Sequence, residues 1–111
     1  MNKRVVITGL GVVAPNGVGL ETFTNAIKNG ISGIKHDAEL ERLQFSCQIA
    51  GKPAISTELS LNYFTALELR NFNSSGILYG VIAGIDAWKD AGLPIEINNE
   101  PDWDSGTIFG T

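Results

Sequence analysis

The chain of 111 residues contains very little of what most catalytic and metal-binding sites require. It has one cysteine, Cys47, and one histidine, His36. A single cysteine cannot form an internal disulfide, which is typical of a reducing compartment, and we expect a cytoplasmic protein. One Cys and one His cannot form a usual zinc site, which needs several nitrogen and sulfur ligands. The sequence therefore predicts neither a disulfide nor a bound metal.

Positive charge and long apolar runs are also scarce. Eight Lys and Arg stand against 12 Asp and Glu, for a net charge of −4, and no basic block occurs. Nucleic acids and anionic membranes are bound by clustered Lys and Arg, so we expect neither as a partner. No apolar run is long enough for a membrane span, and the run after Lys3 and Arg4 is too short for a signal peptide. With 43% hydrophobic residues, the chain is expected to be globular.

The patterns that are present predict alternating strands and helices. A β-branched run predicts a buried strand at residues 3–9, ending in the glycine turn at Gly9 and Gly11. Apolar spacing predicts a helix over Leu20–Asn29, with Gly30 ending it. The later expectations are a loop with a helical turn (31–43), a short strand (45–51), a helix (60–72), a long helix (74–92) and a strand (106–109). This order indicates an α/β layered fold.

The helix over residues 74–92 carries the strongest pattern. Ser74 or Ser75 can cap its start, and Gly92 can end it. We expect a largely buried helix, with its solvent edge marked by Asp86, Lys89 and Asp90. Glycines recur every four residues along one flank, at Gly76, Gly80 and Gly84. Because each costs a helix roughly 1 kcal/mol relative to alanine, we expect a neighbouring backbone to approach that flank closely.

The segment Gly9–Ala14 fits the GxGxxA pattern of dinucleotide-binding turns. In that motif a helix begins at the second glycine and its N–H groups hold a pyrophosphate. Here Pro15, Asn16 and Gly17 follow at once, and the helix is expected to begin near Leu20 instead. A tight turn packed inside the fold is therefore favoured over a nucleotide-binding oxidoreductase, which NAD(P)H titration would detect.

No other side chain forms a convincing site in the sequence. A catalytic cysteine needs a nearby base, and the nearest basic residue after Cys47 is Lys52, so we interpret Cys47 as a small buried residue in a strand. His36 is interpreted as a solvated loop histidine, although a Cys47–His36 dyad stays open. The acidic loop lacks the spacing of a calcium loop, and its carboxylates are expected to be solvated: Glu96, Glu100, Asp102 and Asp104. Trp88 and Trp103 are interpreted as packing residues.

Taken together, several blocks resemble the start of a β-ketoacyl-acyl-carrier-protein synthase, a condensing enzyme of the thiolase-like family. They are RVVITGLGVVAPNGVG (4–19), FTNAIKNGISG (23–33), IAG (49–51), YGVIAGIDAWKDAGL (79–93) and GTIFGT (106–111). The resemblance covers essentially the whole chain and implies a thiolase-like layered α-β-α fold, of which residues 1–111 are an incomplete N-terminal portion. Because the chain stops in a strand-to-turn transition, we also expect a segment of something longer.

That resemblance implies decarboxylative condensation of an acyl thioester with malonyl-carrier protein in fatty acid, polyketide or pigment biosynthesis, with no cofactor. The family's nucleophile lies in a later ACxSG motif and its histidines later still, so no catalytic, cofactor-binding or metal-binding residue is expected in residues 1–111. The expected partners are an acyl carrier protein and a second subunit, in a homodimer. The alternative is a non-catalytic, chain-length-factor-type subunit of a heterodimer. Relatives carry several basic residues before the long helix, whereas only Arg70, beside Glu68, is available here for carrier contact.

Overall fold

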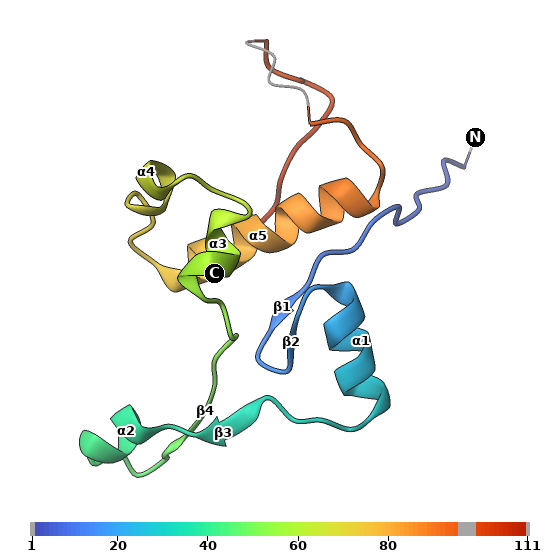
Figure 1. Ribbon diagram of the computed structural model, residues 1–111. Helices are drawn as coiled ribbons and strands as arrows, with labels where there is room; N and C mark the ends of the chain where they lie inside the picture. The colour runs from blue at the N-terminus through green and yellow to red at the C-terminus, as the bar shows by residue number, and fades with distance from the viewer. Residues whose placement is uncertain (1, 96–99, 111) are drawn as a thin grey trace.

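The computed structural model describes residues 2–95 and 100–110. The first half of the chain contains β1 (Val13–Ala14), β2 (Gly17–Val18), α1 (Leu20–Lys28), β3 (Ile34–His36) and α2 (Ala38–Arg42). The second half contains β4 (Ile49–Gly51), α3 (Thr57–Leu61), α4 (Ala66–Leu69) and α5 (Ser75–Asp90). Figure 1 shows α5 at the centre, with the N-terminal segment passing its C-terminal end and the β3–α2–β4 unit projecting below. The described residues form a mixed α and β structure, as expected, with two separate ribbons of two antiparallel strands, and the layered arrangement stays a prediction.

Helix α1 confirms the expectation for this stretch almost to the residue. It ends at Lys28, where the Asn29 N–H donates to the Asn25 carbonyl oxygen and the Gly30 N–H to the Ile27 carbonyl oxygen, both at 3.1 Å. Gly30 then adopts a φ of 66°, the left-handed conformation that glycine adopts without steric strain. Ala26 is the one buried side chain of this helix. The short β1–β2 ribbon precedes α1, with Val13 paired to Val18 and Ala14 to Gly17.

The β3–α2–β4 unit is only partly what the pattern predicted. The helical turn expected in residues 31–43 is α2, but strand β3 beside it was missed. The strand expected over residues 45–51 is restricted to β4, which pairs with β3 in the register Ile34 to Gly51. The preceding turn at Gln44, with a φ of 56°, and the bend after it keep residues 45–48 out of the ladder. Cys47 therefore lies before the strand and not within it.

The single helix expected over residues 60–72 is wrong, because two short helices and a turn occupy this stretch. Helix α3 ends at Leu61, and Thr65 begins α4 through a capping box. In that box the Thr65 hydroxyl accepts from the Glu68 N–H, while the Glu68 carboxylate accepts from the Thr65 N–H at 2.7 Å. Such local side-chain bonds satisfy the free N–H groups of a new helix start, which favours a break over a continuous helix.

Helix α5 is confirmed in its bounds, with Gly92 in the left-handed conformation at a φ of 69°. Ser74 occupies the N-cap position, but its side chain accepts no capping hydrogen bond, which corrects the expected serine cap. It is not largely buried. Only Ile82 is fully buried among its side chains, whereas Ile77 and Trp88 are 61% and 40% exposed. The helix is apolar on most of its circumference, but the described residues cover only part of that circumference.

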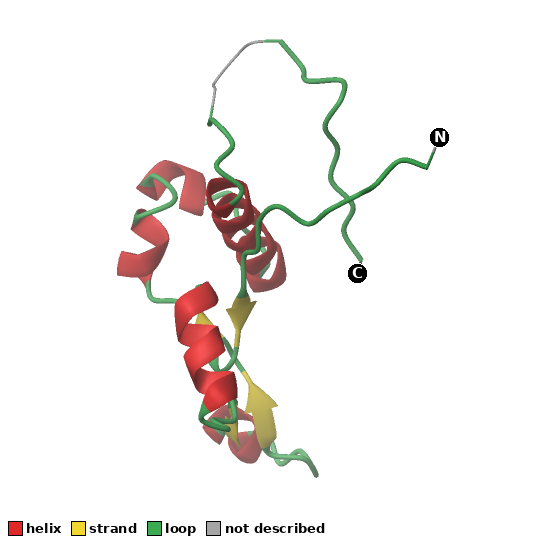
Figure 2. Cartoon of the chain, turned by 90° about the vertical axis from the view of Figure 1, so that its right-hand side faces the viewer, coloured by secondary structure: helices red, strands yellow, loops and turns green. Residues whose placement is uncertain are grey.

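The strands expected at residues 3–9 and 106–109 are not formed. Both segments are extended but unpaired among the described residues, and Figure 2 shows them as loops leading to the two termini. Val5 and Ile7 are 94% and 83% exposed, and Ile108 is fully exposed. A β-branched run favours extended backbone, but a strand also needs a neighbour that accepts and donates its hydrogen bonds. No described segment lies alongside either run in that way.

The whole molecule exposes far more surface than a compact chain of its size. Its accessible surface is 9311 Å², whereas the scaling for a folded 11.9-kDa monomer gives about 5,900 Å². Its radius of gyration is 17.2 Å, against about 13 Å for a compact domain of this length. Many large apolar side chains are exposed, with Val5 and Ile108 among the most exposed.

Candidate functional site

The segment Gly9–Gly11, here called the glycine segment, packs directly against the backbone of α5. A Cβ atom placed on Gly9 would collide with the Ala87 carbonyl oxygen and lie 2.8 Å from the Ala91 Cβ. A Cβ on Gly11 would collide with the Ala83 carbonyl oxygen and lie 2.6 Å from the Ala87 nitrogen. These separations are shorter than any real Cβ contact, so only glycine permits the approach. The expected packing of this segment is therefore confirmed, but the expected tight turn is not formed there: the turn lies at Pro15 and Asn16, between β1 and β2, and Leu10 is 51% exposed.

One hydrogen bond to a side chain holds the glycine segment on α5. The Leu10 N–H, between the two glycines, donates to Asp90 Oδ2 at 2.8 Å. Asp90 lies at the C-terminal end of α5, and its carboxylate takes an N–H group that the dinucleotide motif would leave for a phosphate. The chain continues from Gly11 into β1, and the first helix begins at Leu20. The geometry therefore lacks the helix N-terminus that a pyrophosphate site needs.

The small residues of α5 form one flank, but only part of it is used as expected. A helix advances 100° per residue, so Ala83 and Ala87 lie on the same flank as Gly80 and Gly84. The close backbone approach occurs at the alanines. A Cβ on Gly80 would lie 3.2 Å from the Phe109 ring, and one on Gly84 would have no neighbour within 4 Å.

An apolar groove lies where residues 107–109 cross α5. It has a volume of about 440 Å³, and its lining includes Val81, Ile85, Trp88 and Phe109. The Trp88 indole N–H donates to the Pro94 carbonyl oxygen at 2.9 Å, so the ring is held at one end of the groove. The packing role expected for Trp88 is thus partly met. Trp103, by contrast, is 89% exposed and packs little, which corrects the interpretation of it as a packing residue.

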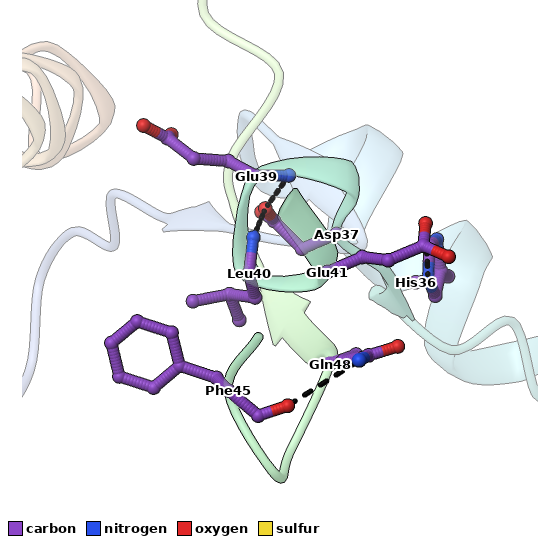
Figure 3. A network of polar contacts seen from close by, with 7 residues as sticks. All are labelled: His36, Asp37, Glu39, Leu40, Glu41, Phe45 and Gln48. Carbon is purple, nitrogen blue, oxygen red and sulfur yellow. Dashed lines mark hydrogen bonds and ion pairs between the residues drawn. The ribbon is translucent and has the colours of Figure 1, made fainter. Parts of the chain in front are cut away.

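Cys47 and His36 do not form a dyad among the described residues. Cys47 is exposed, which corrects its interpretation as a buried residue, and its Sγ lies 3.9 Å from the Ile49 carbonyl oxygen as a weak donor. His36 is the last residue of β3 and not a loop residue, and its Nε2 lies 3.4 Å from Glu41 Oε2 (Figure 3). Its side chain is 55% exposed, so its interpretation as a solvated residue is confirmed. Neither side chain has the base or helix N-terminus that nucleophilic catalysis needs.

Asp37 is the most highly connected side chain of this region, and the sequence patterns did not single it out. Its Oδ1 caps α2 by accepting from the Glu39 and Leu40 N–H groups at 3.0 and 3.1 Å (Figure 3). Its Oδ2 lies 2.5 Å from Lys52 Nζ, which follows β4. The Lys52 ammonium first, and then the capping N–H of Leu40, lower the pKa of Asp37, and Asp37 raises the pKa of Lys52. An Asp directly before a short helix was the available signal.

Arg70 is exposed, and its contact with a carrier protein stays a prediction. It is the C-cap residue of α4, and it forms no ion pair within the described ranges 2–95 and 100–110. The Glu68 carboxylate accepts hydrogen bonds from the backbone N–H and the hydroxyl of Thr65, and these bonds lower the pKa of Glu68. The residues on either side of α4 form an aromatic corner, here defined as Tyr63, Phe64 and Phe72. The rings of Phe64 and Phe72 have centroids 5.0 Å apart, as is usual for tilted aromatic pairs.

A hydrogen bond ties this corner to α5. The Tyr63 hydroxyl donates to Asp86 Oδ2 at 3.1 Å, and the Lys89 ammonium lies 5.3 Å from the centre of the Tyr63 ring. Burial first, and then the Asp86 carboxylate, raise the pKa of Tyr63. The solvent edge expected at Asp86 and Lys89 thus carries tertiary contacts.

The acidic loop does not assemble a cation site among the residues that the structure describes. Asp102 accepts from the Asp104 N–H at 3.0 Å and from the Ser105 hydroxyl, and the Ser105 contact contributes most to lowering its pKa. No cluster of three metal-ligating side chains occurs in residues 2–95 and 100–110. Glu96 lies outside the described residues. In the same described part, no helix combines the length and apolar character that crossing a membrane demands.

Comparison with known proteins identifies the family. The chain matches the model described as "Beta-ketoacyl synthase, N-terminal domain" over residues 2–111. It is 35% identical to 3-oxoacyl-acyl-carrier-protein synthase 2 of Vibrio harveyi, over 87% of this chain and 23% of the relative. It is 33% identical to the synthase 2 of Vibrio cholerae, over 98% of this chain and 25% of the relative. A Streptomyces halstedii protein provisionally named polyketide beta-ketoacyl synthase 1 is 28% identical, over 100% of this chain and 25% of the relative.

This chain belongs to the β-ketoacyl synthase family. It spans about a quarter of the length of the curated relatives that it matches. The family resemblance drawn from the sequence blocks is therefore confirmed.

Proposed function

We propose that residues 1–111 are an incomplete N-terminal part of a 3-oxoacyl-acyl-carrier-protein synthase with a thiolase-like layered fold. The whole protein would be an acyltransferase of fatty acid or polyketide biosynthesis, located in the cytoplasm. The observation that carries this proposal is the family match over residues 2–111, together with the seating of Gly9 and Gly11 on α5. The named activities of the Vibrio and Streptomyces relatives support the choice of pathway.

The reaction of the whole protein would be a decarboxylative Claisen condensation. A cysteine thiolate would attack the acyl thioester, and the carrier thiol would leave. Malonyl-carrier protein would then lose CO₂, and the resulting carbanion would attack the acyl-cysteine, forming the 3-oxoacyl product and freeing the thiolate. Backbone N–H groups would stabilise the oxyanion of each tetrahedral intermediate.

Residues 1–111 would contribute structure to this reaction and no catalytic group, no cofactor and no metal. The only thiol, Cys47, is exposed and donates to a backbone carbonyl, and the only imidazole, His36, is paired with Glu41. Neither arrangement provides an activated nucleophile. Residues 1–111 would instead hold the central helix α5 against the glycine segment Gly9–Gly11.

A condensation assay with radiolabelled malonyl-carrier protein tests this assignment. The 111-residue chain alone is expected to form no 3-oxoacyl product, and a Cys47→Ser variant of an active full-length synthase is expected to retain the parent activity. Product from the chain alone, or a Cys47→Ser variant without activity, would place the chemistry in this segment and overturn the proposal.

The proposed partners are an acyl carrier protein and a second subunit. Arg70 is exposed and unpaired within the described residues, so it is the residue of this segment proposed to meet the acidic carrier. The subunit partner would be an identical chain in a catalytic homodimer. The alternative is a chain-length-factor-type subunit in a heterodimer, and the residue at the family's later ACxSG position would distinguish the two.

An Arg70→Glu variant of the full-length protein tests the proposed carrier contact. For a carrier-binding synthase we expect a KM for the carrier protein raised several-fold at low salt, because charge pairs at a docking surface are screened by salt. An Arg70→Lys variant is the matched control and should retain most of the binding. An unchanged KM in Arg70→Glu would remove Arg70 from the carrier contact.

A further inference from the structure

We draw no further inference here: the strongest candidate, the apolar groove between α5 and residues 107–109, is an unpartnered apolar face, and nothing in the structure shows what covers it.

Discussion

At the scale of single residues, glycine and alanine side by side decide how the chain begins. Gly9 and Gly11 lack the Cβ atoms that would collide with α5, and the helix offers alanine at the points of contact. The Asp90 carboxylate then holds the glycine segment in place by accepting a hydrogen bond from the Leu10 N–H. A GxG pattern after an apolar run is therefore compatible with a packing role, and here the packing role is the one the geometry supports.

Gly11→Val is expected to weaken this contact strongly, since its Cβ would collide with the Ala83 carbonyl oxygen. Overpacking of this kind lowers the free energy of unfolding by about 1–3 kcal/mol. The atoms in the way, the Ala83 carbonyl oxygen and the Ala87 nitrogen, belong to the backbone and cannot rotate aside. Urea unfolding followed by circular dichroism would measure the loss. Gly84→Ala is the matched control: its Cβ would meet nothing within 4 Å, so a helix gain of about 0.5–1 kcal/mol is expected. A Gly11→Val variant as stable as the parent would contradict the packing described here.

Tyr63→Phe removes only the hydroxyl that donates to Asp86. We expect a loss of about 0.5–1.5 kcal/mol in stability, the usual net contribution of one hydrogen bond. A second readout is specific to this bond: in an Asp86→Asn variant the pKa of Tyr63 should fall toward 10.0, because the carboxylate is one cause of its increase. Ultraviolet titration of the phenolate measures that pKa. An unchanged pKa in Asp86→Asn would mean that the contact does not form.

At the scale of elements, short-range chemistry explains the helix bounds better than it explains the strands. Helices α1 and α5 follow the apolar spacing and end at left-handed glycines. The break between α3 and α4 follows the capping box of Thr65. Strands β3 and β4 depend instead on each other. Helix α2, which lies between them, depends on Asp37, whose carboxylate caps the N-terminus of α2 and also pairs with Lys52.

Asp37→Asn tests that junction through its pH dependence. The lowered pKa of Asp37 means that its ionised form favours the folded chain. Its contribution is fully present above the ordinary value of 3.8 and is lost as pH falls through the lower folded pKa. The raised pKa of Lys52 adds stability below its ordinary 10.5, and that part is lost as pH rises through its folded pKa.

Asparagine can still cap α2 but cannot form the ion pair. The variant should therefore be less stable than the parent at neutral pH, and the difference should shrink at both pH extremes. Thermal unfolding across the pH range provides the measurement, with Glu21→Gln on the surface of α1 as a charge-matched control. A stability difference between parent and Asp37→Asn that stayed constant with pH would show that the ion pair contributes nothing.

At the scale of the whole molecule, exposed apolar surface is the dominant feature. The accessible surface exceeds the expectation for a compact chain of this mass by more than half, and the apolar runs near both termini have no strand partner within residues 2–95 and 100–110. Unpaired backbone and contiguous apolar side chains are the features through which chains associate.

We therefore expect the isolated chain to self-associate or to be of low stability. Sedimentation velocity at increasing concentration should show larger species, and an apolar dye should bind. A Val5→Lys and Ile108→Lys double variant should associate less than the parent, because charge on extended edges opposes pairing. Asn2→Lys adds a charge near the N-terminus without replacing an apolar side chain and is the control. A stable, dye-free monomer at all concentrations would refute this expectation.

The sequence alone determined the family and the positions of α1 and α5. Those properties depend on local spacing, on glycines at helix ends and on residue types that are either present or missing. Tertiary structure decided the rest: that Gly9 and Gly11 rest on alanines, that Asp37 joins α2 to Lys52, and that residues 3–9 and 106–109 pair with no other described segment. The physical reason is that a helix closes its hydrogen bonds within itself, whereas a strand, a buried face or an ion pair exists only when a distant segment supplies the other half.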